Sequence, residues 1–227
     1  MIKKLQKLKA KKGFTLVELI VVIAIIGVLA AILIPTMLGF VTSSRVTSAN
    51  TTAAEIKKNI DNFLTDADTA GYGMLKGSAQ NATFTISVTG GTWTVTNSDT
   101  SKFKNGAGMS WDGSGTGSTG ATKVSVTDPE SLLAISLADL FPEVKTAAIV
   151  AYVEAGKAIA VAYTADTDAQ TGNPGFVAGT DFPGITAGTA SATGGWTNPD
   201  KFAWDNSTAG VSATGLIVGT APVVALG

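Results

Sequence analysis

An uninterrupted apolar run dominates the first part of the chain. Sixteen consecutive residues from Leu19 to Ile34 carry no polar side chain, and the segment counted from Leu16, which includes Glu18, is nineteen residues long. As a helix, that length crosses a hydrocarbon core of about 30 Å at about 1.5 Å per residue. The pattern therefore predicts a membrane-spanning helix over residues 16–34.

Helical periodicity continues beyond this run, but with polar residues between the apolar ones. Lys57, Lys58 and Asp61 are among the polar residues that separate apolar positions spaced by three or four. Those apolar positions are Val46, Ala49, Ala53, Ile56, Ile60, Phe63, Leu64 and Ala67. The pattern stops at Gly71, so we expect one helix over residues 14–69, roughly 80 Å long at 1.5 Å per residue. Its second half should pack an apolar stripe on a globular domain.

The remaining residues, 70–227, are rich in Gly, Thr and Ser and contain short segments in which apolar and polar residues alternate. The segment Thr83–Asn97 predicts a β-hairpin with Gly90-Gly91 at its turn. Pairing across that turn opposes Val88 to Trp93. We therefore expect a β-rich globular head, with Trp93 in the core of its sheet.

A second hairpin is predicted from two nearly continuous apolar segments, Thr146–Glu154 and Lys157–Thr164, which turn at Ala155-Gly156. Strands with so few polar residues are expected in the middle of a sheet. The stretch Gly106–Thr122 is rich in Gly, Ser and Thr, and we expect it to be an exposed loop.

A short helix is predicted between the two hairpins. Asp128 is its expected N-cap, Pro129 occupies the first position, and the helix should end before Pro142. The residues expected to face inward are Leu132, Leu133, Leu137 and Leu140. One antiparallel sheet packed on the long helix accounts for all these elements, so the predicted fold class is α+β.

Composition and charge narrow the possible chemistry. The 227 residues include no Cys and no His, which excludes Ser-His-Asp and Cys-His nucleophiles, disulfides and almost every structural zinc site. Six lysines lie in residues 1–13, so ten of the sixteen Lys/Arg remain against seventeen Asp/Glu, a net charge of −7 for residues 14–227. We therefore expect no enzyme activity, no catalytic residue, no cofactor, no metal and no nucleic-acid binding by the body.

The basic block of residues 1–13 predicts the orientation of the apolar run, because a Lys-rich flank stays in the cytoplasm and the body then lies outside. The run has three interpretations. A secretory signal peptide would have a shorter apolar region and a small-residue cleavage site, whereas Ala30-Ala31 is followed by Ile-Leu-Ile. A plain membrane anchor is the second. The third interpretation gives a function to Glu18, because placing a carboxylate at mid-membrane costs about 3 kcal/mol of free energy and such a group usually has a partner. The alternative for Glu18 is a carboxylate near the cytoplasmic interface that snorkels to the head groups.

The segment GFTLVELIVVIAIIGVLAAILIP, residues 13–35, closely resembles the N-terminal motif of type IV pilins and type II secretion pseudopilins. The resemblance implies that prepilin peptidase removes the leader, residues 1–13, by cutting after Gly13. It also implies that Phe14 becomes the N-methylated first residue of the mature chain. Glu18 matches the family's glutamate at the fifth mature position. The absence of Cys makes the chain closer in style to Gram-positive type IV pilins than to disulfide-closed Gram-negative ones.

The resemblance also implies a function, that of a structural subunit of a helical surface filament used in adhesion or twitching motility. Glu18 of one subunit would neutralise the N-terminal amine of its neighbour, so that two buried charges are paired. Gly27 and Pro35 match positions that flank a segment which melts on assembly, and Pro35 is expected to kink the helix. The implied partners are other copies of the chain, prepilin peptidase, an assembly platform with its ATPase, and the cytoplasmic membrane that holds the precursor before the filament becomes extracellular.

Two alternatives stay open at this point. Within the family, the chain would be a pseudopilin of a type II-like secretion or competence system. From another class, it would be a membrane-anchored carbohydrate-binding adhesin with a glycan platform formed by Trp93, Trp111, Trp196 and Trp204. The sequence also contains weak matches to two kinds of motif. Asp66-Ala-Asp68 and Asp166–Gln170 partly match calcium loops, and Asn50, Asn81 and Asn206 match the glycosylation sequon.

Overall fold

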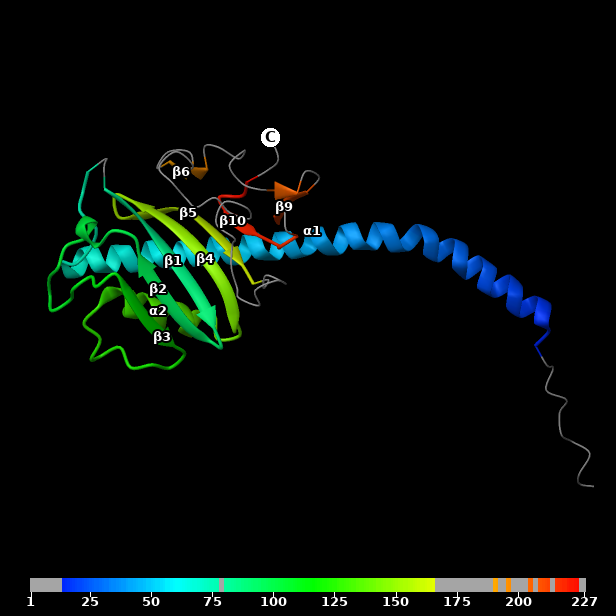
Figure 1. The fold of residues 1–227 in the computed structure, drawn as a ribbon, viewed down its shortest axis with the longest axis horizontal. Helices are drawn as coiled ribbons and strands as arrows, with labels where there is room; N and C mark the ends of the chain where they lie inside the picture. Colours follow the sequence, from blue (N-terminus) through cyan, green and yellow to red (C-terminus); the bar gives the residue numbers. More distant parts are fainter. Residues whose placement is uncertain are drawn as a thin grey trace, which may run out of the picture. The chain divides into compact units, whose positions relative to one another are not determined.

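The computed structural model describes residues 14–77, 80–165, 190–191, 195–196, 204–205, 208–212 and 215–224. The chain divides into two compact units, Met1–Ser43 and Ser44–Gly227. Helix α1 (Leu16–Ala70) contributes residues to both units. The second unit, here called the head, also contains a sheet and a second helix, α2 (Pro129–Leu140) (Figure 1).

The part of α1 that belongs to the head packs one narrow stripe against the sheet. Its buried residues are Ala49, Ala53, Ile56, Ile60, Leu64 and Ala67. Val46 and Phe63 are partly buried and pack on the same core. The stripe predicted from the spacing of apolar residues is therefore confirmed. The three alanines on it allow the helix backbone to approach the sheet closely.

Six antiparallel strands form the main sheet in the order β10-β5-β4-β1-β2-β3 (Figure 1). The strands are β1 (Asn81–Thr89), β2 (Thr92–Asn97), β3 (Ser114–Ser118), β4 (Thr146–Glu154), β5 (Lys157–Thr164) and β10 (Gly219–Ala221). A short 3-10 helix, η1, covers Thr100–Lys102. Two small sheets have two strands each: β6 (Ala190–Ser191) pairs with β7 (Gly195–Trp196), and β8 (Trp204–Asp205) pairs with β9 (Thr208–Ser212). The α+β fold class predicted from the sequence, a long helix against an antiparallel sheet, is confirmed.

Both predicted hairpins form with the expected turns. Strands β1 and β2 pair with Val88 opposite Trp93, and Gly90 and Gly91 adopt φ of 60° and 84°. Positive φ at both central residues is what a type I′ turn requires, because its twist matches that of the strands. Ala155 adopts φ of 51° in the β4–β5 turn, so this alanine takes a conformation that Gly or Asn adopts at lower cost.

The prediction of a continuous exposed loop over Gly106–Thr122 is wrong, because β3 lies within it. β3 pairs with β2 and alternates Ser or Thr with Gly. Cβ atoms added at Gly115 and Gly117 would collide with the backbone of α2 at Ser131 N and Ile135 N. Glycine therefore serves here to bring a strand against a helix, and Ser131 Oγ accepts a 3.0 Å bond from the Thr116 N–H at the strand's outer edge.

Helix α2 begins as predicted, with the Asp128 carboxylate accepting a 2.7 Å bond from the Ser131 N–H. The expected inward position of Leu140 is wrong, since this side chain is 52% exposed. The helix ends at Leu140, and the next residue, Phe141, turns into the core in its place and stacks on Trp93 at 6.1 Å. The buried face of α2 consists of Pro129, Glu130, Leu133, Ala134, Ile135, Leu137 and Ala138, with Leu132 half-buried.

Polar side chains of α1 bind backbone groups of two strands. The Thr220 N–H of β10 donates to Asn50 Oδ1 at 2.8 Å, and the Ala158 N–H of β5 donates to Asp61 Oδ1 at 2.6 Å. The second contact lies beside the irregularity in the β4–β5 pairing at Tyr152/Val153, where the ladder alone leaves backbone groups to satisfy. Gly219 of β10 lies so close to α1 that a Cβ would collide with Ala49.

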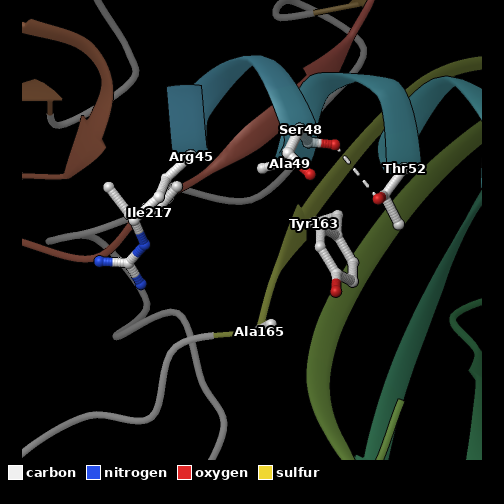
Figure 2. Close-up of a pocket in the computed structure, with 7 residues that line it drawn as sticks. All are labelled: Arg45, Ser48, Ala49, Thr52, Tyr163, Ala165 and Ile217. Carbon is white, nitrogen blue, oxygen red and sulfur yellow. Dashed lines mark hydrogen bonds between the residues drawn. The ribbon is translucent and has the colours of Figure 1, made fainter. Parts of the chain in front are cut away.

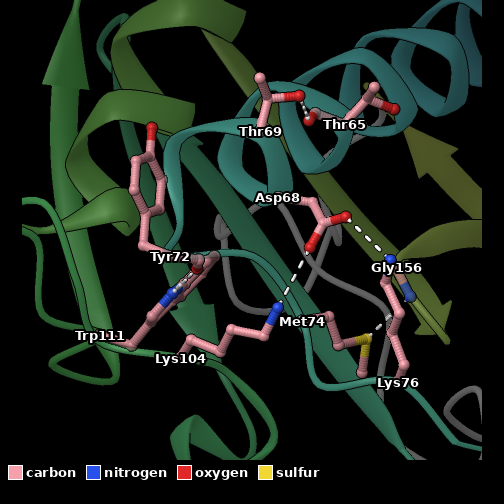
Figure 3. Close-up of polar contacts among 9 residues, drawn as sticks. All are labelled: Thr65, Asp68, Thr69, Tyr72, Met74, Lys76, Lys104, Trp111 and Gly156. Atoms are coloured by element: carbon pink, nitrogen blue, oxygen red, sulfur yellow. Dashed lines mark hydrogen bonds and ion pairs between the residues drawn. The ribbon is translucent and has the colours of Figure 1, made fainter.

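The two tryptophans whose side chains the structure describes are buried. Trp93 is 1% exposed and Trp111 is 4% exposed, so neither presents a surface to a glycan. Trp111 stacks on Phe103 at 4.1 Å, and its Nε1–H donates to the Tyr72 carbonyl at 2.8 Å (Figure 3). The side chains of Trp196 and Trp204 lie outside the described residues.

Candidate functional site

The N-terminal end of α1 is organised around one carboxylate. Thr15 precedes the helix, and its N–H and hydroxyl donate to Glu18 Oε2 at 2.9 and 2.7 Å. The Glu18 N–H donates in return to Thr15 Oγ1 at 3.2 Å. This reciprocal pattern is a capping box, in which two backbone N–H groups at a helix start are satisfied by side chains. Glu18 therefore has a local structural role in addition to any role between subunits.

Sequence reasoning missed Thr15, although the signal was present. Thr15-Leu-Val-Glu18 is the pattern of Ser/Thr followed three residues later by Glu/Gln, immediately before an apolar run. The resemblance carried by Gly13, Phe14 and Glu18 accounted for the same residues in another way. Of these three, Phe14 and Glu18 are described and Gly13 is not, and neither are the lysines of the basic block.

The helix surface after the cap is apolar on all sides and uncovered. Between Phe14 and Val41 the large apolar side chains are 44% to 76% exposed. They are Phe14, Leu16, Val17, Leu19, Ile20, Val21, Val22, Ile23, Ile25, Ile26, Val28, Leu29, Ile32, Leu33, Ile34, Met37, Leu38, Phe40 and Val41. An 18-residue window of α1 reaches a mean hydropathy of 3.2 and none of it is buried. By length and composition the segment suits a bilayer or the interior of an assembly.

This apolar surface extends beyond Ile34, the end expected from the sequence. Hydroxyl groups inside it are satisfied within the helix, since Thr36 Oγ1 donates to the Leu33 carbonyl at 2.9 Å and Thr42 Oγ1 to the Leu38 carbonyl at 3.1 Å. Such bonds reduce the cost of placing a hydroxyl in an apolar environment. The exposed apolar surface therefore runs to Val41, just before the first unit ends at Ser43.

Helix α1 is continuous through both residues expected to weaken it. Pro35 lies inside the helix, and a Cβ added at Gly27 would meet no atom within 4 Å. Melting of the segment between them concerns an assembled filament, so it stays a prediction. The open space around Gly27 shows that no packing among the described residues requires a glycine there.

The carboxylate of Asp68, in one of the two calcium-like stretches, is engaged in structural contacts. Asp68 pairs with Lys104 at 3.3 Å and with Lys76 at 3.4 Å, so it ties the end of α1 to the two segments that carry these lysines (Figure 3). These contacts, the hydrogen bond from Lys104 first, lower the pKa of Asp68. Among the described residues no group of three or more His, Cys, Asp or Glu side chains is placed to hold a metal. The other calcium-like stretch, residues 166–170, lies outside them.

Glu130 is the one fully buried carboxylate among the described residues. It lies in the first turn of α2 and accepts bonds from the Gly113 N–H at 2.9 Å and the Asp112 N–H at 3.4 Å. Burial raises its pKa, against the effect of these bonds. Because its partners are backbone groups of a neighbouring loop, Glu130 joins that loop to α2 and offers no group to a substrate.

Comparison with known proteins gives a match at the N-terminus. Residues 8–34 match the prokaryotic N-terminal methylation motif, a range that includes Gly13, Phe14 and Glu18. A fimbrial protein of Moraxella nonliquefaciens is 47% identical over 53 residues, which are 23% of this chain and 34% of that protein. The type IV major alpha-pilin of Moraxella bovis is 42% identical over 62 residues, and the type IV major fimbrial protein FimA of Dichelobacter nodosus is 39% identical over 61.

The similarity covers only part of these proteins. The matched regions are 27% of this chain and 39% of each of the last two relatives, so the chain spans between a third and two-fifths of the length of these three relatives. No solved structure is significantly similar to the chain. The relatives are named as fimbrial proteins and pilins.

Proposed function

We propose that this chain, which belongs to the type IV pilin family, is the non-enzymatic subunit of an extracellular filament built around the apolar half of α1. A prepilin peptidase removes residues 1–13 and methylates Phe14. An assembly platform and its ATPase then move the subunit from the membrane into the filament. Before assembly the precursor lies in the cytoplasmic membrane with its N-terminus inside and its head outside, the orientation favoured by the basic leader.

One observation carries this proposal, the exposed apolar surface of residues 14–41 with a single charged side chain near its start. Nineteen large apolar side chains in the water-exposed state would cost free energy at about 25 cal/mol per Å² of apolar surface. A membrane removes that surface from water for the precursor, and a bundle of identical helices does so for the filament. Glu18 is the only side chain in this surface that would be charged there.

Cleavage after Gly13 would supply a partner for that charge. The new amine at Phe14 is cationic, and burying it beside a carboxylate avoids the large cost of an unpaired buried charge. Glu18 can accept from a neighbour's amine without giving up its cap, because a carboxylate has about four lone-pair sites and the Thr15 bonds end on Oε2 alone. The capping box then holds the carboxylate in place at the end of the helix.

The two roles of Glu18 are separable by mutation. Glu18→Gln keeps the capping box, in which Gln also serves, and removes the charge. Thr15→Val removes the capping hydroxyl and keeps the charge and the side-chain volume. We expect Glu18→Gln to abolish most filaments on the cell surface while the processed subunit accumulates in the membrane. We expect Thr15→Val to lower filament yield only a few-fold.

Filaments are counted by electron microscopy of whole cells, and the membrane and sheared fractions are compared by immunoblotting. Normal filament assembly by Glu18→Gln would contradict the charge pairing. Loss of filaments in Thr15→Val as complete as in Glu18→Gln would show that the cap, rather than the charge, limits assembly. Glu55→Gln, which changes an exposed carboxylate on the head half of the same helix, serves as the control.

A further inference from the structure

The head contains a pocket of about 190 Å³ that is lined in part by residues of α1. Its lining residues come from α1, from the end of β5 and from the segment before β10, and are Arg45, Ser48, Ala49, Thr52, Tyr163, Ala165 and Ile217 (Figure 2). Figure 2 shows the Arg45 side chain and the Tyr163 ring on opposite sides of the space under the helix.

The pocket has a polar rim and an apolar floor. Arg45 and Ser48 are exposed at the rim, where the guanidinium is the only cationic group among the lining residues. Ala49, Tyr163 and Ile217 form the floor and are each 7% to 8% exposed. A ligand that suits both parts carries an anion joined to a short apolar segment.

The position of Arg45 along the helix gives a second, independent indication. No charged residue lies between Glu18 and Arg45, and the 27 residues from one to the other correspond to about 40 Å of helix. A bilayer with its head groups is about 40–45 Å thick. The exposed apolar surface ends at Val41, about one turn before Arg45. The length of chain between the two charges, taken as helix, therefore matches the thickness of a bilayer with its head groups.

We propose that this pocket binds the phosphodiester of a phospholipid in the outer leaflet while the subunit is stored in the membrane. The inference rests on the membrane-bound precursor of the proposed function. Arg45 binds the phosphate oxygens through its planar guanidinium, the geometry that suits bidentate phosphate recognition. The Ser48 hydroxyl adds a donor at the rim, and the glycerol carbons lie on Ala49 and Ile217.

Arg45 also makes another interaction in this structure, and phosphate binding leaves room for it. A guanidinium has five N–H donors, so it binds a phosphate while it keeps another acceptor. On extraction into a filament the subunit leaves the lipid behind. The pocket thus holds the head at a fixed depth before assembly and contributes to the free energy that the assembly ATPase must overcome.

Arg45 is the only arginine in the chain, which makes a direct test possible. Full-length protein labelled with ¹³Cζ-arginine is reconstituted in liposomes of phosphatidylcholine and phosphatidylglycerol at 3:1, and ¹³C–³¹P dipolar coupling is measured by solid-state NMR. An arginine–phosphate pair with N–H···O bonds of about 2.8 Å places the phosphorus within about 5 Å of Cζ. We expect strong dephasing of the single Cζ signal by phosphorus, and no dephasing would overturn the proposal.

Two variants distinguish binding of a phosphate in the pocket from simple contact of Arg45 with the bulk head groups. Ala165→Leu fills the pocket from an exposed wall and leaves Arg45 in place, so the dephasing should fall by at least half. Ala54→Leu makes the same change at an exposed position of α1 outside the pocket and should leave the dephasing unchanged. Equal dephasing in wild type and Ala165→Leu would mean that Arg45 only reaches the head-group layer, and would overturn the pocket.

A further arm identifies the source of the phosphate. In bilayers of uncharged galactolipid with millimolar inorganic phosphate we expect no dephasing, and its appearance there would replace the lipid by a free anion as the ligand. Flotation of the liposomes is checked first. Protein that does not float with them contradicts the membrane-bound precursor and the pocket inference together, whereas protein that floats without dephasing contradicts the pocket inference alone.

Discussion

The two halves of α1 differ in how far their apolar side chains are buried, although they belong to one helix. In residues 14–41 the large apolar side chains are 44% to 76% exposed and cover every side of the helix. In residues 49–67 the buried apolar residues form a single stripe that is at most 8% exposed, and most residues on the other sides are polar. The first half has no partner in the described part of its own chain, whereas the second half has the sheet.

This difference shows where each half obtains its stability. The head half is fixed by complementary contacts within one molecule, down to a glycine in β10 that fits against Ala49. The apolar half depends on what surrounds the molecule, a bilayer or other copies. Substitutions in the head half should therefore change the free energy of unfolding of the head, and similar substitutions in the apolar half should not.

The largest expected difference between the halves comes from isoleucine truncation. Ile60→Ala removes a fully buried side chain from the stripe and should lower the free energy of unfolding by about 2–5 kcal/mol. Ile26→Ala, at a position 58% exposed, should change it by less than about 0.5 kcal/mol. Urea unfolding of the full chain in detergent micelles, followed by tryptophan fluorescence, measures both. Equal effects would mean that the halves are one cooperative unit.

A matched pair of glycine substitutions should give the next largest effect. Gly219→Ala puts a methyl group into the backbone of α1 at Ala49, and such overpacking costs about 1–3 kcal/mol. Gly27→Ala meets no atom within 4 Å and raises helix propensity, so the head should unfold at the same urea concentration as wild type. A stable Gly219→Ala head would show that β10 can shift away from α1.

A smaller effect is expected from the polar link between α1 and β5. Asp61→Ala removes the acceptor of the Ala158 N–H and the partner of Lys57, and should cost about 1–2 kcal/mol. Asp61→Asn keeps an amide oxygen at the same place and should cost less than half as much. Equal losses in the two variants would assign the effect to the charge of Asp61 and not to the bond with β5.

The smallest effect is a pH dependence at Glu130, the buried counterpart of the exposed Glu18. Burial raises its pKa in the folded head, so the folded state binds the proton more tightly than the unfolded chain does. The contribution of Glu130 to stability is therefore greatest below its usual pKa of 4.5 and declines as the pH rises through the raised value. Glu130→Gln has no such proton.

The stability of wild type relative to Glu130→Gln should accordingly be lower at pH 7 than at pH 4. Urea unfolding of both proteins at the two pH values gives this difference, because titration of all other groups cancels between them. A difference that is constant with pH would mean that Glu130 has an ordinary pKa. Glu130→Ala, which leaves the Gly113 N–H without its acceptor, should be less stable than Glu130→Gln at both values.

Sequence periodicity was sufficient for elements whose pattern reflects burial on one face. It gave the stripe of α1 and both hairpins, down to the pairing of Val88 with Trp93. It failed for β3, because a strand of alternating Gly and Ser or Thr carries no apolar signal, and its glycines are explained only by contact with α2. It also missed the links from Asn50 and Asp61 to the sheet, since polar residues on a helix surface have no pattern that names a distant partner.

The candidate site also has features that the sequence predicts and features that only the structure shows. Length and hydropathy identified the apolar run, and the capping box at Thr15 could also have been predicted, from the pattern Thr15-Leu-Val-Glu18. The end of the exposed surface at Val41, beyond the expected Ile34, needed the structure, because Thr36 looks like a polar interruption until its hydroxyl is seen to bond within the helix. The pocket at Arg45 joins residues up to 172 positions apart in sequence, from Arg45 to Ile217, so no local pattern contains it.

The most direct test of the central claim, that this chain is a processed filament subunit, is mass spectrometry of filaments sheared from cells that express it. The account predicts a dominant chain that begins at N-methylated Phe14 and lacks residues 1–13. It also predicts that Gly13→Ser, next to the expected cut, leaves the full-length chain in the membrane and the sheared fraction empty. A full-length chain beginning at Met1, present only in the membrane of wild-type cells, would contradict the account.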